Sequence, residues 1–511
     1  MASEQRTTDS SGATKWRPPA KFWPVYVSLI LAMFLSALDQ TIVATALPTV
    51  VGELGNLSLM AWVITAYTVA MTVTMVIWGK FGDLMGRREL FLVALGIFAV
   101  GSALCGLSQS VGQLIAFRAV QGLGGGGLMV LSQAILADLL PPRERPRYMA
   151  PLGALFGLAS VIGPLLGGFI TDHWSWQWIF WINLPLGGLA LAVSFKFLRL
   201  GKPDIAFRTD FGGIVSVSVA VVALTLLVSW GGTTYSWTSL PILGLAAVVV
   251  LAVAAFVLSE RKATDAIIPL HFFANPSFSI PTALGVLAAL GMFAAVSYIP
   301  TYLQMVYGLG ATLSGFLVLP LIAGTMVTSI LSGAIITRSG QYRMFPPLGM
   351  GLMGVAFALL STMTSQTSLW LVGAYLGLLG LGLGCVLQVL VLIVQNEVRR
   401  AELGTATSSN NFFREIGATM GIAVVGGLFT SGLLGKLQSL DLAGLVGSIE
   451  ELTPALVAAL PAAQQAVVIE AYASSLVPLF GYLVPLFVAG FVLALLMPKG
   501  EMQAGAEVVG H

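Results

Sequence analysis

Two ionisable residues of opposite charge, Asp39 and Arg118, stand inside long apolar runs of this sequence. Asp39 lies in LDQTIVATALP, about 18 residues beyond Lys21, which is roughly 27 Å along a helix. A carboxylate at that depth in a bilayer costs at least ~2.5 kcal/mol, so it must face a water-filled cavity or a partner. An acid that is neutral part of the time is what a proton carrier needs. The alternative is an Asp that packs helices through a bond to a Ser or Thr.

Arg118 lies in LIAFRAVQGLGGGG, about six residues from the outer end of its apolar run. A guanidinium keeps its proton in a protein, so it needs a carboxylate, backbone carbonyls or water as compensation. Asp39 is the carboxylate that we expect to pair with it, and an Arg that reaches the outer membrane face is the alternative. The glycines that follow allow close helix packing, since no Lys with Ser or Thr completes a phosphate-binding loop.

A third charged feature is the stretch GKFGDLMGRR, residues 79–88, between apolar runs at 61–78 and 90–107. We expect a short loop at the cytoplasmic face, because short loops rich in Lys and Arg stay there. Its glycines would let the backbone turn, and Asp83 would pair with a neighbouring arginine or a helix N-terminus. An ordinary positive loop is the alternative. The residues expected to gate conformational change are Gly79, Asp83, Gly86, Arg87 and Arg88.

The elements that position these residues must be membrane spans. The 511 residues are 57% hydrophobic and 9% charged, with a mean hydropathy of +0.92, which indicates a polytopic membrane protein. A net charge of +2 argues against a nucleic-acid partner. Cys105 and Cys385 fall inside apolar runs, where we expect packing and no metal site. Residues 1–20 are polar and read as a disordered cytoplasmic tail, not a signal peptide.

Apolar runs of span length predict fourteen helices, with both termini in the cytoplasm. Of the 24 Lys and Arg, all but Lys436 and Arg118 fall in segments that this model places on the cytoplasmic side. The predicted helices are 24–48, 60–79, 90–108, 112–137, 149–171, 177–197, 211–231, 240–259, 278–304, 312–336, 346–364, 368–395, 404–435 and 474–497.

An internal repeat appears when the chain is shifted by 254 residues, which lays Gly79 and Gly86 on Gly333 and Gly340. The repeat predicts two pseudo-symmetric six-helix bundles with a site between them, the usual construction of a secondary transporter. The expected division is a tail at 1–20, a first bundle at 21–200, two inserted helices at 201–262, a second bundle at 263–500 with an outer loop at 436–473, and a cytoplasmic tail at 501–511.

The fifth predicted helix contains GLASVIGPLLGG, in which small residues recur around a proline. Small residues permit backbone contact with a facing helix, and the proline removes one helical hydrogen bond. We therefore expect a hinge or a sliding surface here, with a generic packing face as the alternative. The residues of this hinge are Gly157, Gly163, Pro164, Gly167 and Gly168.

Taken together, these stretches resemble the fourteen-helix drug:proton antiporter branch of the major facilitator superfamily. The loop at 79–88 is similar to that superfamily's loop between helices 2 and 3, and LDQTIVATALP, RAVQG and GPLLGG are similar to signatures of the branch. Ala44 stands where the branch has an Asn. The resemblance implies an all-α major facilitator fold, proton coupling through Asp39 and Arg118, and a proton gradient as energy source without a cofactor.

The expected function is therefore a proton-coupled antiporter of the cytoplasmic membrane that exports hydrophobic or cationic drugs by alternating access. An exporter of a lipid or an endogenous metabolite is the first alternative. An intramembrane enzyme is a second, although no nucleophile with a base stands in the spans. We expect a monomer, with small-molecule substrate, protons and the bilayer as partners. Glu415 is a secondary acid candidate, and the candidates to line a substrate cavity, with plain packing as the alternative, are Gln40, Tyr298, Tyr302, Gln304, Gln388, Asn410 and Asn411.

Overall fold

The computed structural model describes residues 7–8, 14–15, 18–55, 59–201, 209–232, 234–439 and 454–498. Within these ranges thirteen helices are long and apolar enough to cross a membrane, and Phe345–Leu360 is a shorter apolar helix. Helices are what a bilayer allows, because every backbone N–H and C=O must bond within its own segment. The all-α polytopic class and the fourteen predicted spans are confirmed.

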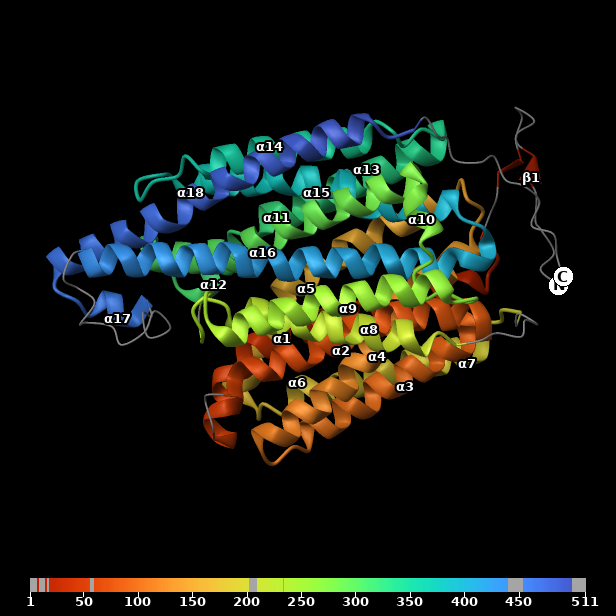
Figure 1. Cartoon of the computed structure of the whole chain (residues 1–511), viewed down its shortest axis with the longest axis horizontal. Helices are drawn as coiled ribbons and strands as arrows, with labels where there is room; N and C mark the ends of the chain where they lie inside the picture. Colours follow the sequence, from red (N-terminus) through yellow and green to blue (C-terminus); the bar gives the residue numbers. More distant parts are fainter. Residues whose placement is uncertain are drawn as a thin grey trace.

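The first part of the chain, red to yellow in Figure 1, forms six spans that pack side by side. The fourth of these begins at a capped end, where the Ser110 hydroxyl accepts a hydrogen bond from the Gln113 N–H. The helices are α1 (Phe22–Leu54), α2 (Met60–Met85), α3 (Arg87–Gly106), α4 (Val111–Leu139), α5 (Arg145–His173), α6 (Trp178–Trp181) and α7 (Asn183–Phe197).

The remaining helices form an inserted pair and a second group, coloured from yellow-green to blue in Figure 1. They are α8 (Phe211–Trp230), α9 (Leu240–Lys262), α10 (His271–Ala274), α11 (Pro276–Tyr307), α12 (Ala311–Phe316), α13 (Leu319–Ser339), α14 (Phe345–Leu360), α15 (Leu369–Glu397), the 3₁₀ turn Arg400–Glu402, α16 (Leu403–Ser439), α17 (Pro454–Ala458) and α18 (Ala462–Leu495).

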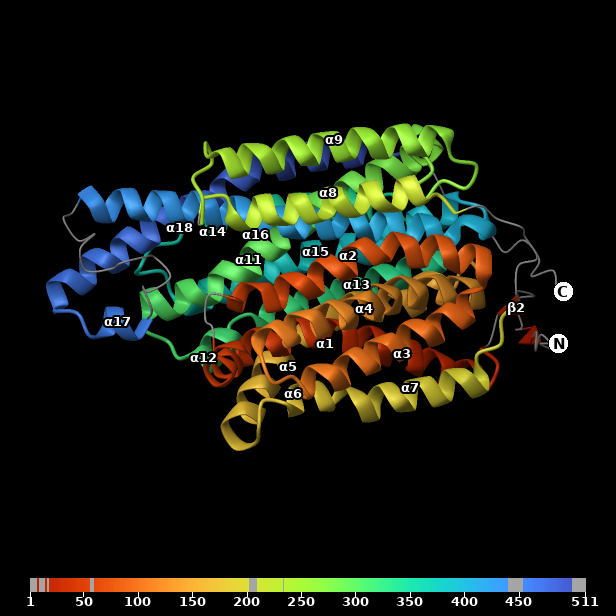
Figure 2. The same ribbon diagram turned by 60° about the horizontal axis from the view of Figure 1, so that its bottom comes forward.

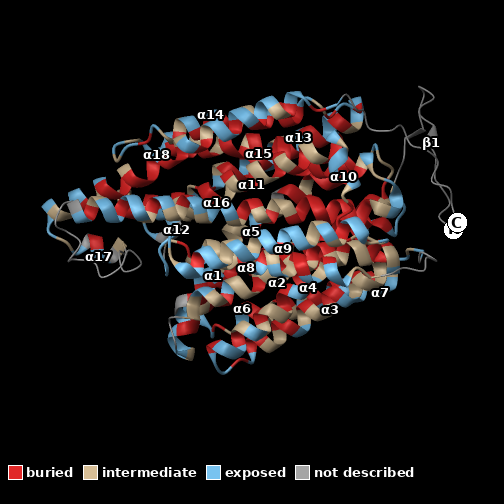
Figure 3. Cartoon of the chain, in the orientation of Figure 1, coloured by how far each residue is buried: buried red, intermediate tan, exposed pale blue. Residues whose placement is uncertain are grey.

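Helix α1 begins and α18 ends at the same end of the molecule, which we call the terminus side (Figure 1). The opposite end, near α17, is the far side. Buried residues face neighbouring helices, while α9 is exposed along most of its length (Figure 3). The predicted domain boundaries stay predictions.

The internal repeat is present in the packing. A Cβ on Gly122 of α4 would meet the Tyr67 carbonyl of α2, and a Cβ on Gly380 of α15 would meet the Leu321 carbonyl of α13. Tyr67 and Leu321 are separated by the same 254-residue shift. The turns after α2 and α13 also correspond, since Gly86 and Gly340 have φ of 106° and 76°, which glycine adopts without a steric penalty.

Two sequence predictions are wrong in detail. The stretch 79–88 is not a loop, because α2 continues to Met85 and Gly86 alone breaks the helix. The outer loop predicted at 436–473 is shorter, since α16 runs to Ser439 and α18 starts at Ala462; 440–453 lie outside the described residues. Within the tail at 1–20, the described residues include an antiparallel pair of two-residue strands, β1 (Thr7–Thr8) and β2 (Thr14–Lys15), and the disorder of the tail stays a prediction.

Candidate coupling and gating sites

The Asp39 carboxylate lies midway along α1 and is fully buried, at 0% exposure. It forms an ion pair with the Arg118 guanidinium of α4, which is 1% exposed. Its other oxygen accepts a hydrogen bond from Gln121 Nε2 at 2.8 Å. The predicted Asp39–Arg118 partnership is confirmed, and both alternatives for these residues, a Ser/Thr-bonded Asp and a surface-reaching Arg, are wrong.

The ion pair is part of a larger buried network. Asn183 of α7 donates to Asp39 at 3.2 Å and to the Ser102 hydroxyl of α3 at 3.0 Å. The Arg118 guanidinium lies over the Tyr67 ring of α2, 4.1 Å from its centroid. The network therefore joins five spans around one carboxylate, and each charge is compensated by a charge and by further hydrogen bonds.

In this arrangement the Asp39 carboxylate is the counter-ion of Arg118. If Asp39 became neutral, Arg118 would be left as a buried charge without a counter-ion, and breaking such a pair costs about 3–5 kcal/mol. The bundle can lower that cost by moving or admitting water. The sequence by itself assigned no role to Gln121, which stands in the stretch RAVQG, or to Asn183.

A second polar site lies at the terminus side, where Asp83 of α2 meets the start of α16. The Asp83 carboxylate accepts hydrogen bonds from the backbone N–H groups of Gly404 and Thr405 at 2.9 and 2.7 Å, and from the Thr405 hydroxyl at 2.8 Å. It also accepts from Arg87 Nε at 3.1 Å. A carboxylate at a helix N-terminus is stabilised by unpaired N–H groups and the helix dipole. The predicted pairing of Asp83 with an arginine and with a helix N-terminus is confirmed.

Arg87 extends this site across both groups of helices. It pairs with Asp138 of α4, and its Nη2 donates to the Arg400 carbonyl at 3.0 Å. Arg400 returns a bond to Asp138 at 3.2 Å. We call Asp83, Arg87, Asp138, Arg400 and Thr405 the terminus-side lock. Arg88 is not a member, because it donates to the Leu198 carbonyl at 2.6 Å and so ties α3 to the end of α7.

Two glycines bring the helix groups into backbone contact beside this lock. A Cβ on Gly79 of α2 would meet the Ser408 side chain and lie 2.6 Å from the Gly404 carbonyl of α16. A Cβ on Gly333 of α13 would lie 2.7 Å from the Pro146 carbonyl of α5. Both contacts, which we call the seam, lie near the terminus side. The two helix groups therefore close against each other at the terminus side.

The glycines of α5 separate into different environments. A Cβ on Gly163 would meet the Thr41 side chain of α1, and one on Gly167 would lie 2.8 Å from the Ile42 carbonyl. Gly157 faces Ile322 of α13, with 3.0 Å from its Cβ position to Cγ2, whereas Gly168 has nothing within 4 Å. Helix α5 continues through Pro164, which is exposed. Whether this segment acts as a hinge stays a prediction.

Gly163→Leu is expected to reduce transport about tenfold while leaving expression intact. The added side chain needs the space that Thr41 occupies, and overpacking costs about 1–3 kcal/mol, enough to shift a two-state balance without unfolding the bundle. The measurement is efflux rate per amount of membrane-inserted protein. Gly168→Leu is the matched control and should transport normally; equal rates for both variants would refute a gating role for Gly163.

The sequence model of the major facilitator superfamily matches residues 29–422. The chain belongs to the major facilitator superfamily. It is 42% identical over 493 residues to an uncharacterized MFS-type transporter of Mycobacterium tuberculosis, covering 95% of this chain and 71% of that one. It is 39% identical over 405 residues to the multidrug transporter protein MdtP of Bacillus subtilis, covering 79% and 74%. It is a multi-pass membrane transporter with relatives named as multidrug transporters.

Solved structures agree on the fold. The human organic anion transporter MFSD10 superposes with a TM-score of 0.60 at 18% identity, covering 93% of this chain and all of that one. The proton:xylose symporter XylE superposes with a TM-score of 0.59 at 12% identity, covering 92% and 95%. At these identities the likeness concerns the major facilitator architecture alone.

In this transporter the predicted cavity residues lie in several places. Asn411 of α16 donates to Gln133 of α4 at 2.8 Å and so joins the two helix groups. Asn410 donates to Thr282 of α11 at 3.3 Å. Gln388 of α15 is buried against Gly153 of α5. The Asn411 and Gln388 amide oxygens are buried without a hydrogen-bond partner. These two therefore remain candidates for cargo contact.

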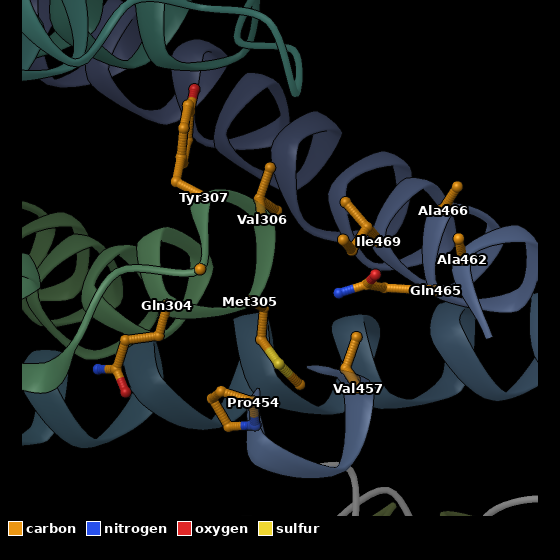
Figure 4. A pocket seen from close by; sticks show the side chains of 11 residues that line it. Gln304, Met305, Val306, Tyr307, Pro454, Val457, Ala462, Gln465, Ala466 and Ile469 are labelled. Atoms are coloured by element: carbon orange, nitrogen blue, oxygen red, sulfur yellow. The ribbon is translucent and has the colours of Figure 1, made fainter. Parts of the chain in front are cut away.

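The remaining cavity candidates are held by other contacts. Tyr302 is fully buried and donates to the Thr364 carbonyl at 3.2 Å, and Tyr298 donates to the Ile422 carbonyl at 2.8 Å, so both hydroxyls brace helices. Gln40 donates to the Met71 sulfur at 3.1 Å. Gln304 lines a cavity of about 330 Å³ between α11, α17 and α18, at the far side and away from the seam (Figure 4).

The acids of the second helix group differ from each other. Glu415 is 5% exposed on α16 and interacts electrostatically with Arg414 and with Tyr67. Glu397, at the end of α15, accepts a hydrogen bond from the Tyr342 hydroxyl at 3.4 Å. Burial raises the pKa of Tyr342 to about 12, assisted by the Glu397 charge, so the phenol stays a donor at neutral pH.

Proposed function

We propose that the protein is a proton-coupled antiporter that exports hydrophobic or cationic small molecules across the cytoplasmic membrane by alternating access. The observation that carries this proposal is the buried network of Asp39, Arg118, Gln121 and Asn183. It contains one group that can gain or lose a proton and one that must stay charged, and their separation requires the bundle to rearrange. The relatives named as multidrug transporters support drugs as cargo.

In this proposal the terminus side is cytoplasmic and the structure is the outward-facing state. The lock and the seam close the cytoplasmic side, and the far side is where cargo leaves. A proton from outside neutralises Asp39, which releases Arg118 and favours the inward-facing state, where the proton departs and new cargo binds. The transporter works as a monomer in the bilayer and uses the proton gradient without a cofactor.

The test is efflux of a fluorescent cationic dye from cells that express the transporter, with and without a proton-gradient uncoupler. We expect efflux in excess of vector-only cells to disappear when the uncoupler is added, because the cargo then has no driving force. Cells depleted of ATP by other means but holding a proton gradient should still export. Efflux that persists after uncoupling would contradict proton coupling. If the dye is not exported but another solute collapses the proton gradient when it is added, that solute and not the dye would be the cargo.

A further inference from the structure

The inserted helices α8 and α9 lie over the junction between the two helix groups (Figure 2). Val217 and Val221 of α8 are buried in one apolar cluster with Val76 of α2 and Phe412 of α16. Ile267 and Ile268, from the segment after α9, complete this cluster. The inserted pair therefore packs against both α2 and α16, the two helices whose contact closes the terminus side.

Two carboxylates hold the terminus-side end of this pair together. Asp210 caps α8, where its Oδ1 accepts from the Gly213 N–H and from the Ser259 hydroxyl of α9, both at 2.8 Å. Glu260 of α9 is 5% exposed, and its Oε1 accepts from the backbone N–H groups of Ile267 and Ile268 at 3.0 and 3.2 Å. Glu260 thus fixes the turn that places these isoleucines over the junction.

The second oxygen of each carboxylate is different. Asp210 Oδ2 and Glu260 Oε2 are both buried and have no hydrogen-bond partner. A Cβ on Gly213 would meet Asp210 Oδ2 and would lie 3.0 Å from Glu260 Oε1, so the two carboxylates flank the same α-carbon. Buried polar atoms are paired in folded proteins, and an ionised carboxylate can only accept. Two buried acceptors without donors, on carboxylates that flank one α-carbon, indicate a missing positive group.

Among the residues that the structure describes, no cation bonds to either unpaired oxygen. Lys80 of α2 is near enough to act electrostatically on Glu260, but it donates no hydrogen bond to that carboxylate. Arg261 and Lys262 on the same helix are exposed, and α16 contributes the phenyl ring of Phe412 on its side of the cluster. Two like charges at this separation disfavour each other's ionisation.

We propose that Asp210 and Glu260 hold one proton between them, as a second proton-binding site separate from Asp39. The proton comes from water on the terminus side, and it converts one carboxylate into an O–H donor to the other, so that both unpaired oxygens are satisfied. When the proton leaves, the two negative charges repel and the turn at Ile267 and Ile268 loosens. The site thereby makes the cover over the α2–α16 junction sensitive to pH on that side.

The test is infrared spectroscopy of the purified full-length protein at neutral pH, in which a protonated carboxyl gives a carbonyl band that a carboxylate lacks. We expect this band to lose one carboxyl equivalent in Glu260→Gln and equally in Asp210→Asn, since the amide then donates to the remaining ionised acid. Asp172→Asn, at an exposed acid, is the matched control and should leave the band unchanged.

A wild-type titration keeps the proposal testable if a variant fails to fold, because raising the pH should deplete the same band without any substitution. A band that both variants retain would overturn the proposal. So would a thermal midpoint that Mg²⁺ or Ca²⁺ raises in the wild type but not in Glu260→Gln, since the pair would then be a metal site. None of these readouts requires transport, so the result is independent of whether Asp39 couples protons to export.

Discussion

Asp39→Asn is expected to abolish uphill efflux and leave a folded transporter. The substituted amide keeps the size of the carboxylate and can still accept from Arg118, but it is permanently neutral. If protonation drives the conformational cycle, the variant keeps the equilibrium between inward-facing and outward-facing states that belongs to the neutral form, so it cannot use the gradient. The measurement is proton-gradient-driven efflux in proteoliposomes, where we expect uphill transport to fall to the level of empty vesicles.

Companion variants separate coupling from packing. Asp39→Glu should retain part of the activity, because the acid is kept. Arg118→Ala should resemble the Asn variant, since a buried Asp39 without its cation is driven to the neutral form. Asp172→Asn, at an exposed acid on the far end of α5, should transport as the wild type. Wild-type uphill efflux by Asp39→Asn would place the proton elsewhere, and Glu415 would be the next acid to test.

Asp83→Ala is expected to open the terminus side. The substitution removes three hydrogen bonds to the start of α16 and one of the two carboxylate partners of Arg87, which keeps Asp138, and breaking a buried pair costs about 3 kcal/mol or more. In the proposed cycle the lock exists only when the terminus side is closed. Losing this interaction energy therefore shifts the equilibrium between the open and closed states by roughly a hundredfold toward the open one. The measurement is the rate at which a membrane-impermeant thiol reagent, applied from the terminus side, modifies a cysteine at Ser329.

Ser329 is a suitable reporter because it is 1% exposed and lies one turn before Gly333 on α13, where a Cβ on Gly153 of α5 would be 3.2 Å from its hydroxyl. The native Cys105 and Cys385 are buried and free, so they contribute a constant background. Glu89→Ala is the matched control, since Glu89 is also an acid near the terminus side and it pairs with the adjacent Arg88 within α3. Equal labelling rates in Asp83→Ala and Glu89→Ala would show that the lock does not hold this side closed.

Much of this architecture could be predicted from the sequence, because the bilayer imposes its rules locally. Span length follows from bilayer thickness, so apolar runs located all fourteen helices, and the glycine repeat between residues 79–86 and 333–340 recurs in the packing. A buried charge also predicts that an oppositely charged partner lies nearby. Arg118 needed a carboxylate at depth, and Asp39 was the expected one in the first half of the chain.

The tertiary structure alone decided which groups meet across the chain. Asp83 was visible as an acid that would seek a helix N-terminus, but nothing local names α16, more than 300 residues away, or adds Asp138 and Arg400. Gly79 belongs to a helix and not to a turn, because close contact with α16 offsets the poor helix propensity of glycine. The same holds for Asp210 and Glu260, whose unpaired oxygens appear only once α8 and α9 are packed. The apolar composition of each span reflects the bilayer that surrounds it, so it can be read from that segment alone. Hydrogen-bond partners depend on which helix faces are brought together by packing.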